Sequence, residues 1–281
     1  MAYLELKNIS KTYGKGNNVT EVLSNINLKI EEGEFVAIVG FTGSGKTTLV
    51  NLINGLIETT SGEVLFKDKP VSGTSHERGV IFQNYSLLPW LTVGQNVYMA
   101  VKEAFPKEKK SVLNKMVKDY VDMVHLGSAI TKRPKELSGG MRQRVAVARA
   151  LAMKPEMIIM DEPLGALDAL TRGTLQDEIL KIWGKEKRTA LLITNDVDEG
   201  IYMADRIIPL RPGPKATLGP EFKIDIERPR DKTELNDNPI YKETRNAIIE
   251  YLMDIGNDRK SMVQKEYVLP DLDPKSFVEF A

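Results

Sequence analysis

The sequence contains no cysteine, only two histidines, and no surplus of charge of either sign. Of its 281 residues, 39 are lysine or arginine and 39 are aspartate or glutamate. The lack of cysteine excludes disulfides, thiolate metal sites and a cysteine nucleophile. His76 and His125 do not have the spacing of a metal-ligand pair, so we interpret both as surface or helix-face residues. The balanced charge argues against nucleic acid as a partner, because binding to phosphates usually requires a basic surplus.

Long apolar runs are missing as well. No stretch of about 18 apolar residues occurs, so the sequence predicts no membrane span. Residues 1–14 lack the basic and then apolar layout of a signal peptide, and their pattern indicates a strand. We therefore expect a cytoplasmic protein, in which any role at a membrane comes through a partner.

Short, wholly apolar runs are present, each followed by a loop and a helical pattern. This arrangement is typical of a parallel sheet that helices cover on both faces. The clearest runs are residues 35–39, 80–82, 157–160 and 190–193. Ahead of them, residues 3–30 alternate between polar and apolar around a turn-rich stretch, which predicts a small antiparallel sheet.

Two further regions are expected to be helical. Between about residues 92 and 155 apolar residues recur at helical spacing, which indicates a helical insertion into the α/β core. After about residue 228 the composition turns polar, and one more helix is expected at about 239–255. Asn238 is placed to cap this helix, Pro239 to begin it and Gly256 to end it. The apolar stripe of that helix consists of Ile240, Thr244, Ile248, Leu252 and Ile255.

Residues 40–47 match the pattern G-x-x-x-x-G-K-[ST], directly after the apolar run that ends at Val39. Backbone N–H groups of such a loop hold a polyphosphate, and its glycines let the chain approach the phosphates closely. We expect Lys46 to bridge the outer phosphates and the Thr47 hydroxyl to ligate Mg²⁺. The other nucleotide contacts expected in and beside this loop are Gly40, Thr42, Gly43, Ser44, Gly45 and Thr48.

The apolar run at residues 157–160 is followed by two acidic residues, Asp161 and Glu162. Asp161 is placed to meet the Mg²⁺ ion. Glu162, one step further along an extended chain, points elsewhere and can polarise the attacking water as a general base.

A third motif, LSGGM at residues 137–141, begins a predicted helix. Ser138, Gly139 and Gly140 offer a hydroxyl and free N–H groups at the helix N-terminus, which make a second anion site. One nucleotide does not need two such sites in a single chain. We therefore expect a dimer in which the second site of each chain closes over the γ-phosphate held by the other.

With these three elements in this order, residues 3–228 resemble the ATP-binding-cassette (ABC) transporter ATPases. The resemblance implies an α/β fold: a P-loop NTPase core with a mainly parallel sheet, an antiparallel β-subdomain and an inserted α-helical subdomain. Residues 1–228 would form the nucleotide-binding domain and residues 229–281 a C-terminal extension. The resemblance also implies ATP and Mg²⁺ as cofactors and ATP hydrolysis as the activity.

Family features can be assigned to further positions of this sequence. Tyr13 matches the aromatic residue that stacks on adenine. Gln83 matches the glutamine that contacts Mg²⁺ and the attacking water, and Asp168 belongs to the loop that crosses the dimer interface.

Within the family, residues 82–93, 132–134 and 165–172 are similar to an importer group for nitrate, bicarbonate, cyanate, sulfonate and taurine. The likeness is greatest to nitrate-type subunits, in which a segment like Arg228-Pro229-Arg230 and a terminal helix follow the core. It implies a peripheral subunit on the cytoplasmic face of the inner membrane, bound to an integral membrane permease. An extracytoplasmic solute-binding protein would be an indirect partner.

The apolar loop beside Gln83 is the expected docking site of the permease, since exposed apolar patches usually mark partner sites. Its apolar side chains are Tyr85, Leu87, Leu88 and Trp90. The alternative is that these side chains pack beneath the helical subdomain.

One position departs from the family pattern. Asn195 stands before Asp196, where the family places a histidine that contacts the γ-phosphate. An asparagine amide donates a hydrogen bond to phosphate, but it is shorter than histidine and cannot carry a positive charge. We therefore predict slower hydrolysis at this site with ATP binding kept, and a heterodimer with one fast and one slow site. A homodimer with two slow sites is the alternative.

Three other functions compete with an ATPase of nitrate or nitrite import. One is a structural ATP-binding subunit whose partner hydrolyses the nucleotide, which Asn195 favours whereas Gln83 and Glu162 oppose it. Another is the ATPase of a sulfonate or taurine importer. A DNA-repair or ribosome-associated ATPase is disfavoured by the neutral charge, the single cassette and the lack of a long coiled-coil insertion.

Overall fold

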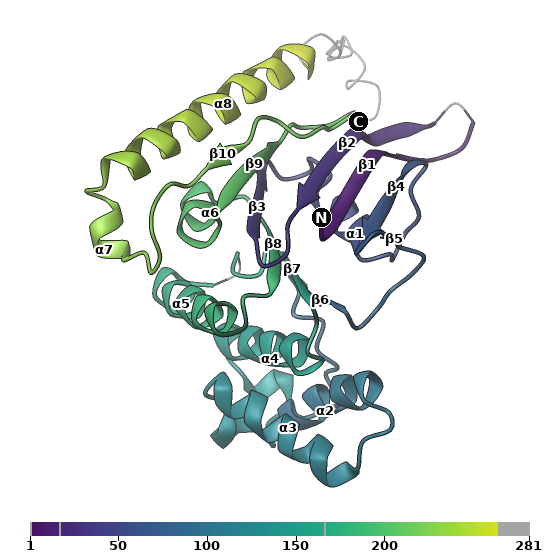
Figure 1. The fold of residues 1–281 in the computed structure, drawn as a ribbon, viewed down its shortest axis with the longest axis vertical. Coiled ribbons are helices and arrows are strands. Elements are labelled where there is room, and N and C mark those ends of the chain that lie inside the picture. Colours follow the sequence, from purple (N-terminus) through teal and green to yellow (C-terminus); the bar gives the residue numbers. More distant parts are fainter. Residues whose placement is uncertain (1, 17, 166, 264–281) are drawn as a thin grey trace, which may run out of the picture.

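The protein is described by a computed structural model that covers residues 2–16, 18–165 and 167–263. Its larger sheet has six strands in the order β10-β9-β3-β8-β7-β6 (Figure 1). Strands β9, β3, β8, β7 and β6 run parallel, and β10 pairs with β9 antiparallel. The strands are β3 (Phe35–Gly40), β6 (Arg78–Ile81), β7 (Met157–Asp161), β8 (Thr189–Thr194), β9 (Arg206–Leu210) and β10 (Phe222–Lys223).

The four apolar runs of the sequence form β3, β6, β7 and β8, so the predicted parallel sheet is confirmed. Only Phe82 falls outside, because β6 ends at Ile81. All residues of β3, β6, β7 and β8 are buried, which explains why their apolar runs are continuous.

A smaller sheet of four strands has the order β2-β1-β4-β5, and its paired strands are antiparallel. Its strands are β1 (Leu4–Tyr13), β2 (Thr20–Ile30), β4 (Ser61–Phe66) and β5 (Lys69–Pro70). The antiparallel pairing within residues 3–30 is confirmed. Helix α1 (Lys46–Ile53) packs between this sheet and the larger one, because its apolar side chains share one core with Leu6 of β1 and Ile38 of β3. This packing fixes the phosphate loop, which immediately precedes α1.

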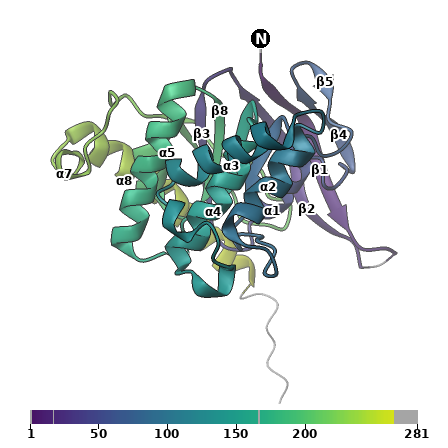
Figure 2. The same cartoon turned by 90° about the horizontal axis from the view of Figure 1, so that it is seen from below.

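Helices α2 (Val93–Ala104), α3 (Lys110–Met123) and α4 (Gly139–Ala152) lie together at the end of the molecule below the sheets in Figure 1. Two 3₁₀ turns, Gly127–Ala129 and Pro134–Glu136, join α3 to α4. The structure describes all of residues 92–155, and no strand occurs there, as the helical spacing predicted. Figure 2, like Figure 1, shows α4 beside α5 (Ala169–Glu186). The division into domains at these boundaries stays a prediction.

The last three helices of the described residues are α6 (Val197–Met203), the short α7 (Lys232–Leu235) and the long α8 (Pro239–Val263). Asn238 caps α8 as predicted, since its Oδ1 accepts hydrogen bonds from the N–H groups of Ile240 at 2.9 Å and Tyr241 at 3.2 Å. None of the described helices combines the length and the apolarity that a membrane crossing requires.

Two expectations for α8 are wrong. Gly256 does not end the helix, which continues to Val263. A Cβ at Gly256 would lie 3.2 Å from the ring of Phe41, so the glycine makes room for the phosphate loop against α8. The apolar stripe begins one residue later than expected, because Ile240 is exposed and Tyr241 is buried. The unpatterned sequence after the helix, residues 264–281, lies outside the described residues.

Candidate active site

A cavity of about 580 Å³ opens where the carboxyl ends of β7 and β8 meet the phosphate loop and the N-terminus of α1. This is where open α/β sheets bind ligands. The cavity brings together nine of the site residues predicted from the sequence with seven residues that were not predicted. Its lining residues are Val22, Thr42, Gly43, Gly45, Lys46, Thr47, Thr48, Gln83, Glu162, Leu164, Gly165, Arg172, Thr194, Asn195, Asp196 and Glu199.

The phosphate loop forms a cradle at one wall. Gly43 and Gly45 have φ angles of 78° and 95°, a left-handed conformation that residues with a side chain rarely adopt. The Lys46 ammonium donates hydrogen bonds of 2.9 Å to each of the carbonyls of Gly40 and Phe41. Ser44 is buried, and its hydroxyl has no hydrogen-bond partner within the described residues. Such a loop at a helix N-terminus fits the phosphates of a nucleotide.

Glu162 is held between two other predicted residues. One of its carboxylate oxygens lies 3.1 Å from the Nζ of Lys46, and the other accepts a 3.0 Å hydrogen bond from the Nε2 of Gln83. Its φ angle of 44° turns the chain sharply just after β7. The carboxylate therefore lies at the cavity beside the lysine, and its role as a general base stays a prediction.

Asp161 is buried directly beneath this wall. Burial raises the pKa of its carboxyl group and the charge of Glu162 adds to the effect, while a hydrogen bond from Thr47 and the charge of Lys46 oppose it. A buried carboxylate next to a hydroxyl gains stability from a divalent cation. The oxygen donors of Asp161, Thr47 and Gln83 suit Mg²⁺, so these residues fit the ion that the sequence predicted.

Asn195 and the residues around it form another part of the cavity wall. Asn195 is exposed to the cavity, and Asp196 caps α6 by accepting hydrogen bonds from the N–H groups of Asp198 at 2.9 Å and Glu199 at 3.1 Å. Arg172 contacts Asp196 at 3.3 Å. Asn195 thus follows the end of β8 at the cavity, two residues before the start of α6.

Sequence reasoning missed Arg172 and Glu199, which also line the cavity. Glu199 accepts hydrogen bonds from the Thr194 hydroxyl at 2.5 Å and the Gln176 amide at 3.3 Å, and burial raises its pKa. Arg172 lies one helical turn after Asp168, and Glu199 lies three residues after the cap Asp196. These spacings indicate helix starts but not a role at the cavity.

Other predicted residues lie outside this cavity. Ser138 caps α4 by accepting a 3.3 Å hydrogen bond from Met141 N–H, and Asp168 caps α5 in the same way with a 3.0 Å bond from Thr171 N–H. A Cβ at Gly140 would lie 2.5 Å from the methyl carbon of Thr171, so the starts of α4 and α5 are in contact. Gly139 belongs to the same helix start. The helix starts that carry Ser138 and Asp168 thus lie outside the cavity of their own chain. The expected dimer requires this arrangement, because there they would contact the nucleotide held by the partner.

Tyr13 ends β1, is 43% exposed and lies apart from the cavity lining. The Nζ of Lys11 lies 5.2 Å from the centre of its ring. Val22, on the neighbouring strand β2, is the residue of this sheet that lines the cavity. The stacking of Tyr13 on adenine stays a prediction.

The apolar loop after β6 divides into a packed and an exposed part. Tyr85 and Leu87 pack against the main core, as in the alternative interpretation. Asn96 holds the loop by bonding the N–H of Leu88 at 2.8 Å and its carbonyl at 3.2 Å. Trp90 is 65% exposed, so the expectation of a docking surface rests chiefly on this residue.

Comparison with known proteins identifies the family of the chain. The family profile described as ABC transporter matches residues 23–165. The bicarbonate transport ATP-binding protein CmpD of Synechocystis sp. is 42% identical over 251 residues, which cover 89% of each chain. The nitrate import ATP-binding protein NrtD of Synechococcus elongatus is 40% identical over 250 residues, 89% of this chain and 91% of that protein.

A solved structure shows the same fold. The dimeric ATP-binding cassette MJ0796 in a post-hydrolysis state, bound to ADP and Pi, matches with a TM-score of 0.71 and 31% identity. The match covers 80% of this chain and all of that one. The predicted P-loop NTPase fold is therefore confirmed, and the chain belongs to the ABC transporter family as an ATPase that uses ATP and Mg²⁺.

Proposed function

We propose that the chain is the ATP-hydrolysing subunit of an importer for a small oxyanion, with nitrate or nitrite as the preferred cargo. The observation that carries the hydrolytic role is the placement of Glu162 between Lys46 and Gln83 at the cavity wall. Support for the cargo comes from similarity alone, because an ATPase subunit does not touch the transported anion. The relatives named for bicarbonate and nitrate are almost equally similar, at 42% and 40% identity. Both anions are planar, carry one negative charge and present oxygen atoms.

Two ATP molecules would be enclosed between two ABC subunits. Ser138, Gly139 and Gly140 are presented at the start of α4, away from the cavity of their own chain, and Asp168 stands beside them at the start of α5. In the proposed dimer this surface closes over the γ-phosphate held by the partner. Hydrolysis then reopens the dimer, and the movement reaches the permease through the loop that carries Trp90. The proposed location is peripheral, at the cytoplasmic face of the inner membrane, through that permease.

A second function has one specific observation in its favour. Asn195 stands at the cavity wall without the charge of the family's histidine, which favours a chain that binds ATP tightly and hydrolyses it slowly. In a heterodimer, such a chain would complete the faster site of its partner. A homodimer with two slow sites is the competing assembly.

Reconstitution with the permease and the solute-binding protein tests the proposal. ATP hydrolysis is measured while nitrate, nitrite, cyanate, bicarbonate or taurine is added in turn. We expect nitrate and nitrite to stimulate turnover. Stimulation by bicarbonate alone would reassign the cargo within the oxyanions, and stimulation by taurine alone would move the chain to the sulfonate and taurine group. Basal hydrolysis that no anion stimulates would contradict the proposed import role.

A further inference from the structure

The C-terminal segment, which we define as residues 228–263, reaches the active site through the short helix α6. Its residues contact α6 at both ends. Asn195 and Asp196 immediately precede α6, so the position of this helix sets the position of the cavity wall they form. In Figure 1, α8 runs along the outer side of the molecule over β10 and beside α6.

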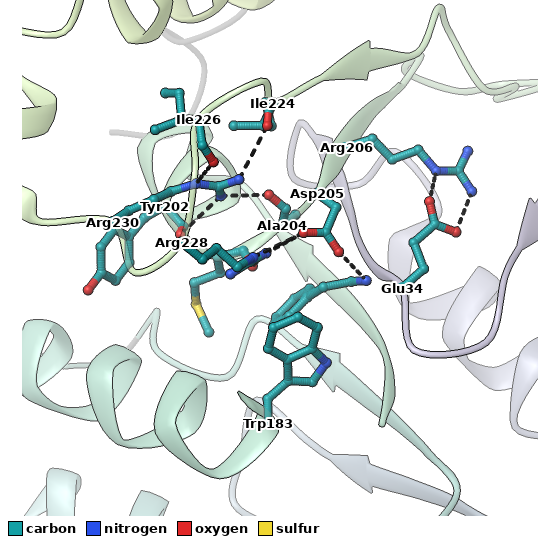
Figure 3. A network of polar contacts seen from close by, with 12 residues as sticks. Glu34, Trp183, Tyr202, Ala204, Asp205, Arg206, Ile224, Ile226, Arg228 and Arg230 are labelled. Carbon is teal, nitrogen blue, oxygen red and sulfur yellow. Dashed lines mark hydrogen bonds and ion pairs between the residues drawn. The ribbon is translucent and has the colours of Figure 1, made fainter. Parts of the chain in front are cut away.

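Arg230 holds the far end of α6, as Figure 3 shows. Its side chain is buried, and its guanidinium donates hydrogen bonds to the carbonyls of Ile201 at 2.6 Å and Ala204 at 2.7 Å. It also reaches the carbonyls of Tyr202, Ile224 and Ile226. Burial, with a contribution from Arg228, lowers the pKa of Arg230 to about 10, so the group keeps its charge at neutral pH. A cation at this position satisfies the carbonyls that a helix leaves free at its C-terminus.

Arg228 supports the same end. One of its nitrogens donates a 2.6 Å hydrogen bond to the carbonyl of Met203, the last residue of α6, and a 2.8 Å bond to Asp205. Its guanidinium lies 4.6 Å from the ring centre of Trp183 (Figure 3). Two arginines of the C-terminal segment thus hold the end of α6 that is remote from the cavity.

Tyr241 and Arg245 hold the near end. Asp198, in the first turn of α6, accepts hydrogen bonds from the Tyr241 hydroxyl at 2.8 Å and from the Nε of Arg245 at 2.6 Å. Its second oxygen lies 3.3 Å from another nitrogen of Arg245. Burial, together with the hydrogen bond to Asp198, raises the pKa of Tyr241 to about 12, so this hydroxyl remains a donor. Three hydrogen bonds to one carboxylate fix the first turn of α6 against α8.

The fixed turn follows the cavity wall directly in the sequence, because α6 begins at Val197, next to Asp196. The side chain of Asp196 accepts from the backbone N–H groups of Asp198 and Glu199, and its other oxygen contacts Arg172 of α5. The loop of Asn195 is therefore held by α5 on one side and, through Asp198, by α8 on the other. An asparagine reaches less far than a histidine, so its amide meets a phosphate only if its backbone is placed accurately.

We propose that Tyr241, Arg245 and Arg230 are positioning residues for ATP hydrolysis, which act through α6 on Asn195 and Asp196. None of the three lines the cavity. The inference rests on the ATPase activity and on the proposed role of Asn195, and it is independent of which anion is transported.

The test uses the full chain in the reconstituted complex, with ATP turnover measured in the absence of transported anion. Arg245→Ala is expected to lower kcat about ten-fold, since a small misplacement of reacting groups has effects of this size or larger. KM for ATP should stay within about two-fold, because the phosphate loop is untouched.

Arg245→Lys should restore part of kcat, and Tyr241→Phe should lower kcat less than Arg245→Ala does. Lys242→Ala, at an exposed position beside Tyr241, is the matched control and should leave kcat unchanged.

A double variant separates positioning from stability. If Arg245 acts through Asp198, then Asp198→Asn combined with Arg245→Ala should be no slower than the slower single variant. A lower melting temperature with wild-type kcat in the folded protein would assign these residues to stability and overturn the proposal. So would kcat losses that multiply in the double variant. Arg230→Lys carries a greater risk of unfolding, so Arg245 and Tyr241 decide the outcome. Basal turnover does not depend on the cargo, so a wrong anion assignment would leave these results unchanged.

Discussion

The Nζ atom of Lys46 lies 3.1 Å from a carboxylate oxygen of Glu162, so the cation of the phosphate loop is paired with the acid that follows β7. Both side chains are largely shielded from solvent, which makes the pair stronger than one on the surface. The phosphates of ATP compete with this carboxylate for the ammonium group. We therefore propose that nucleotide binding frees one oxygen of Glu162 for the attacking water, while the other oxygen keeps its hydrogen bond from Gln83.

This pairing predicts a specific behaviour for Glu162→Gln. Turnover should fall by about 10²- to 10³-fold, because the general base is lost. ATP affinity should be kept or increased, because an uncharged amide competes less well for Lys46. Phosphate release and binding of a fluorescent ATP analogue measure the two effects, with the exposed Glu243→Gln as control. Turnover that survives Glu162→Gln in this chain alone would favour the structural ATP-binding subunit.

Asn195→His should make the site faster. The longer and protonatable side chain reaches the γ-phosphate from the same wall, so we expect turnover to rise about ten-fold while ATP affinity changes little. Asn195→Ala, which removes the amide donor, should lower turnover below that of the natural chain. Turnover is measured at saturating ATP in the purified complex. An unchanged rate in Asn195→His would contradict the role given to this residue.

The parts of the site that could be predicted are those whose residues are adjacent in the sequence. Lys46 and Thr47 begin a helix one short loop after a strand, and Asp161 ends another strand with Glu162 next to it, so local spacing was enough to place them. Arg172 and Glu199 reach the cavity only because α5 and α6 pack beside each other. The spacing of residues within each helix does not indicate which other helix packs beside it.

The fold shows the same limit. The run that forms β9 contains Arg206 and Pro209, and a proline is unusual inside a parallel sheet, so this strand was not predicted. Gly256 suggested a helix end, since glycine in a helix interior is less stable than alanine by about 1 kcal/mol. The contact with Phe41, far away in the sequence, explains why a glycine stands there instead. Likewise, only the folded chain shows that Leu87 faces the core and Trp90 faces solvent.

The magnesium site gives a prediction for Thr47. Its hydroxyl is hydrogen-bonded to Asp161, and both groups are oxygen donors suited to Mg²⁺. Chelation of the metal should abolish hydrolysis. Thr47→Ala should raise the Mg²⁺ concentration needed for half-maximal turnover about ten-fold, whereas Thr47→Ser, which keeps the hydroxyl, should behave like the natural chain. A titration with Mg²⁺ at fixed ATP measures this shift, and equal curves for all three proteins would contradict the assignment.

Trp90 is expected to anchor the permease. Large aromatic side chains at the centre of an interface commonly contribute 2 kcal/mol or more, so Trp90→Ala should weaken binding to the permease by about ten-fold or more. Basal hydrolysis by the ATPase subunit alone should not change. Met99→Ala provides a control, since Met99 is also a large exposed apolar residue, 55% accessible, on α2. Loss of binding in both variants would indicate a general apolar contact, and wild-type binding in Trp90→Ala would place the permease elsewhere.

Glu199 predicts how stability depends on pH. Burial raises the pKa of its carboxyl group above the ordinary value of 4.5, so the folded chain holds this proton more tightly than the unfolded chain does. Wherever the folded state binds more protons, the free energy of unfolding decreases as pH rises. The natural chain should therefore lose stability relative to Glu199→Gln as pH increases above about 4.5, and the difference should become constant at lower pH, where the carboxyl group is protonated in both states. Calorimetric melting temperatures of the two proteins across this range measure the trend, with Glu243→Gln as the exposed control. A difference that shrinks as pH rises would mean that Thr194 and Gln176 stabilise the charged carboxylate more than burial destabilises it.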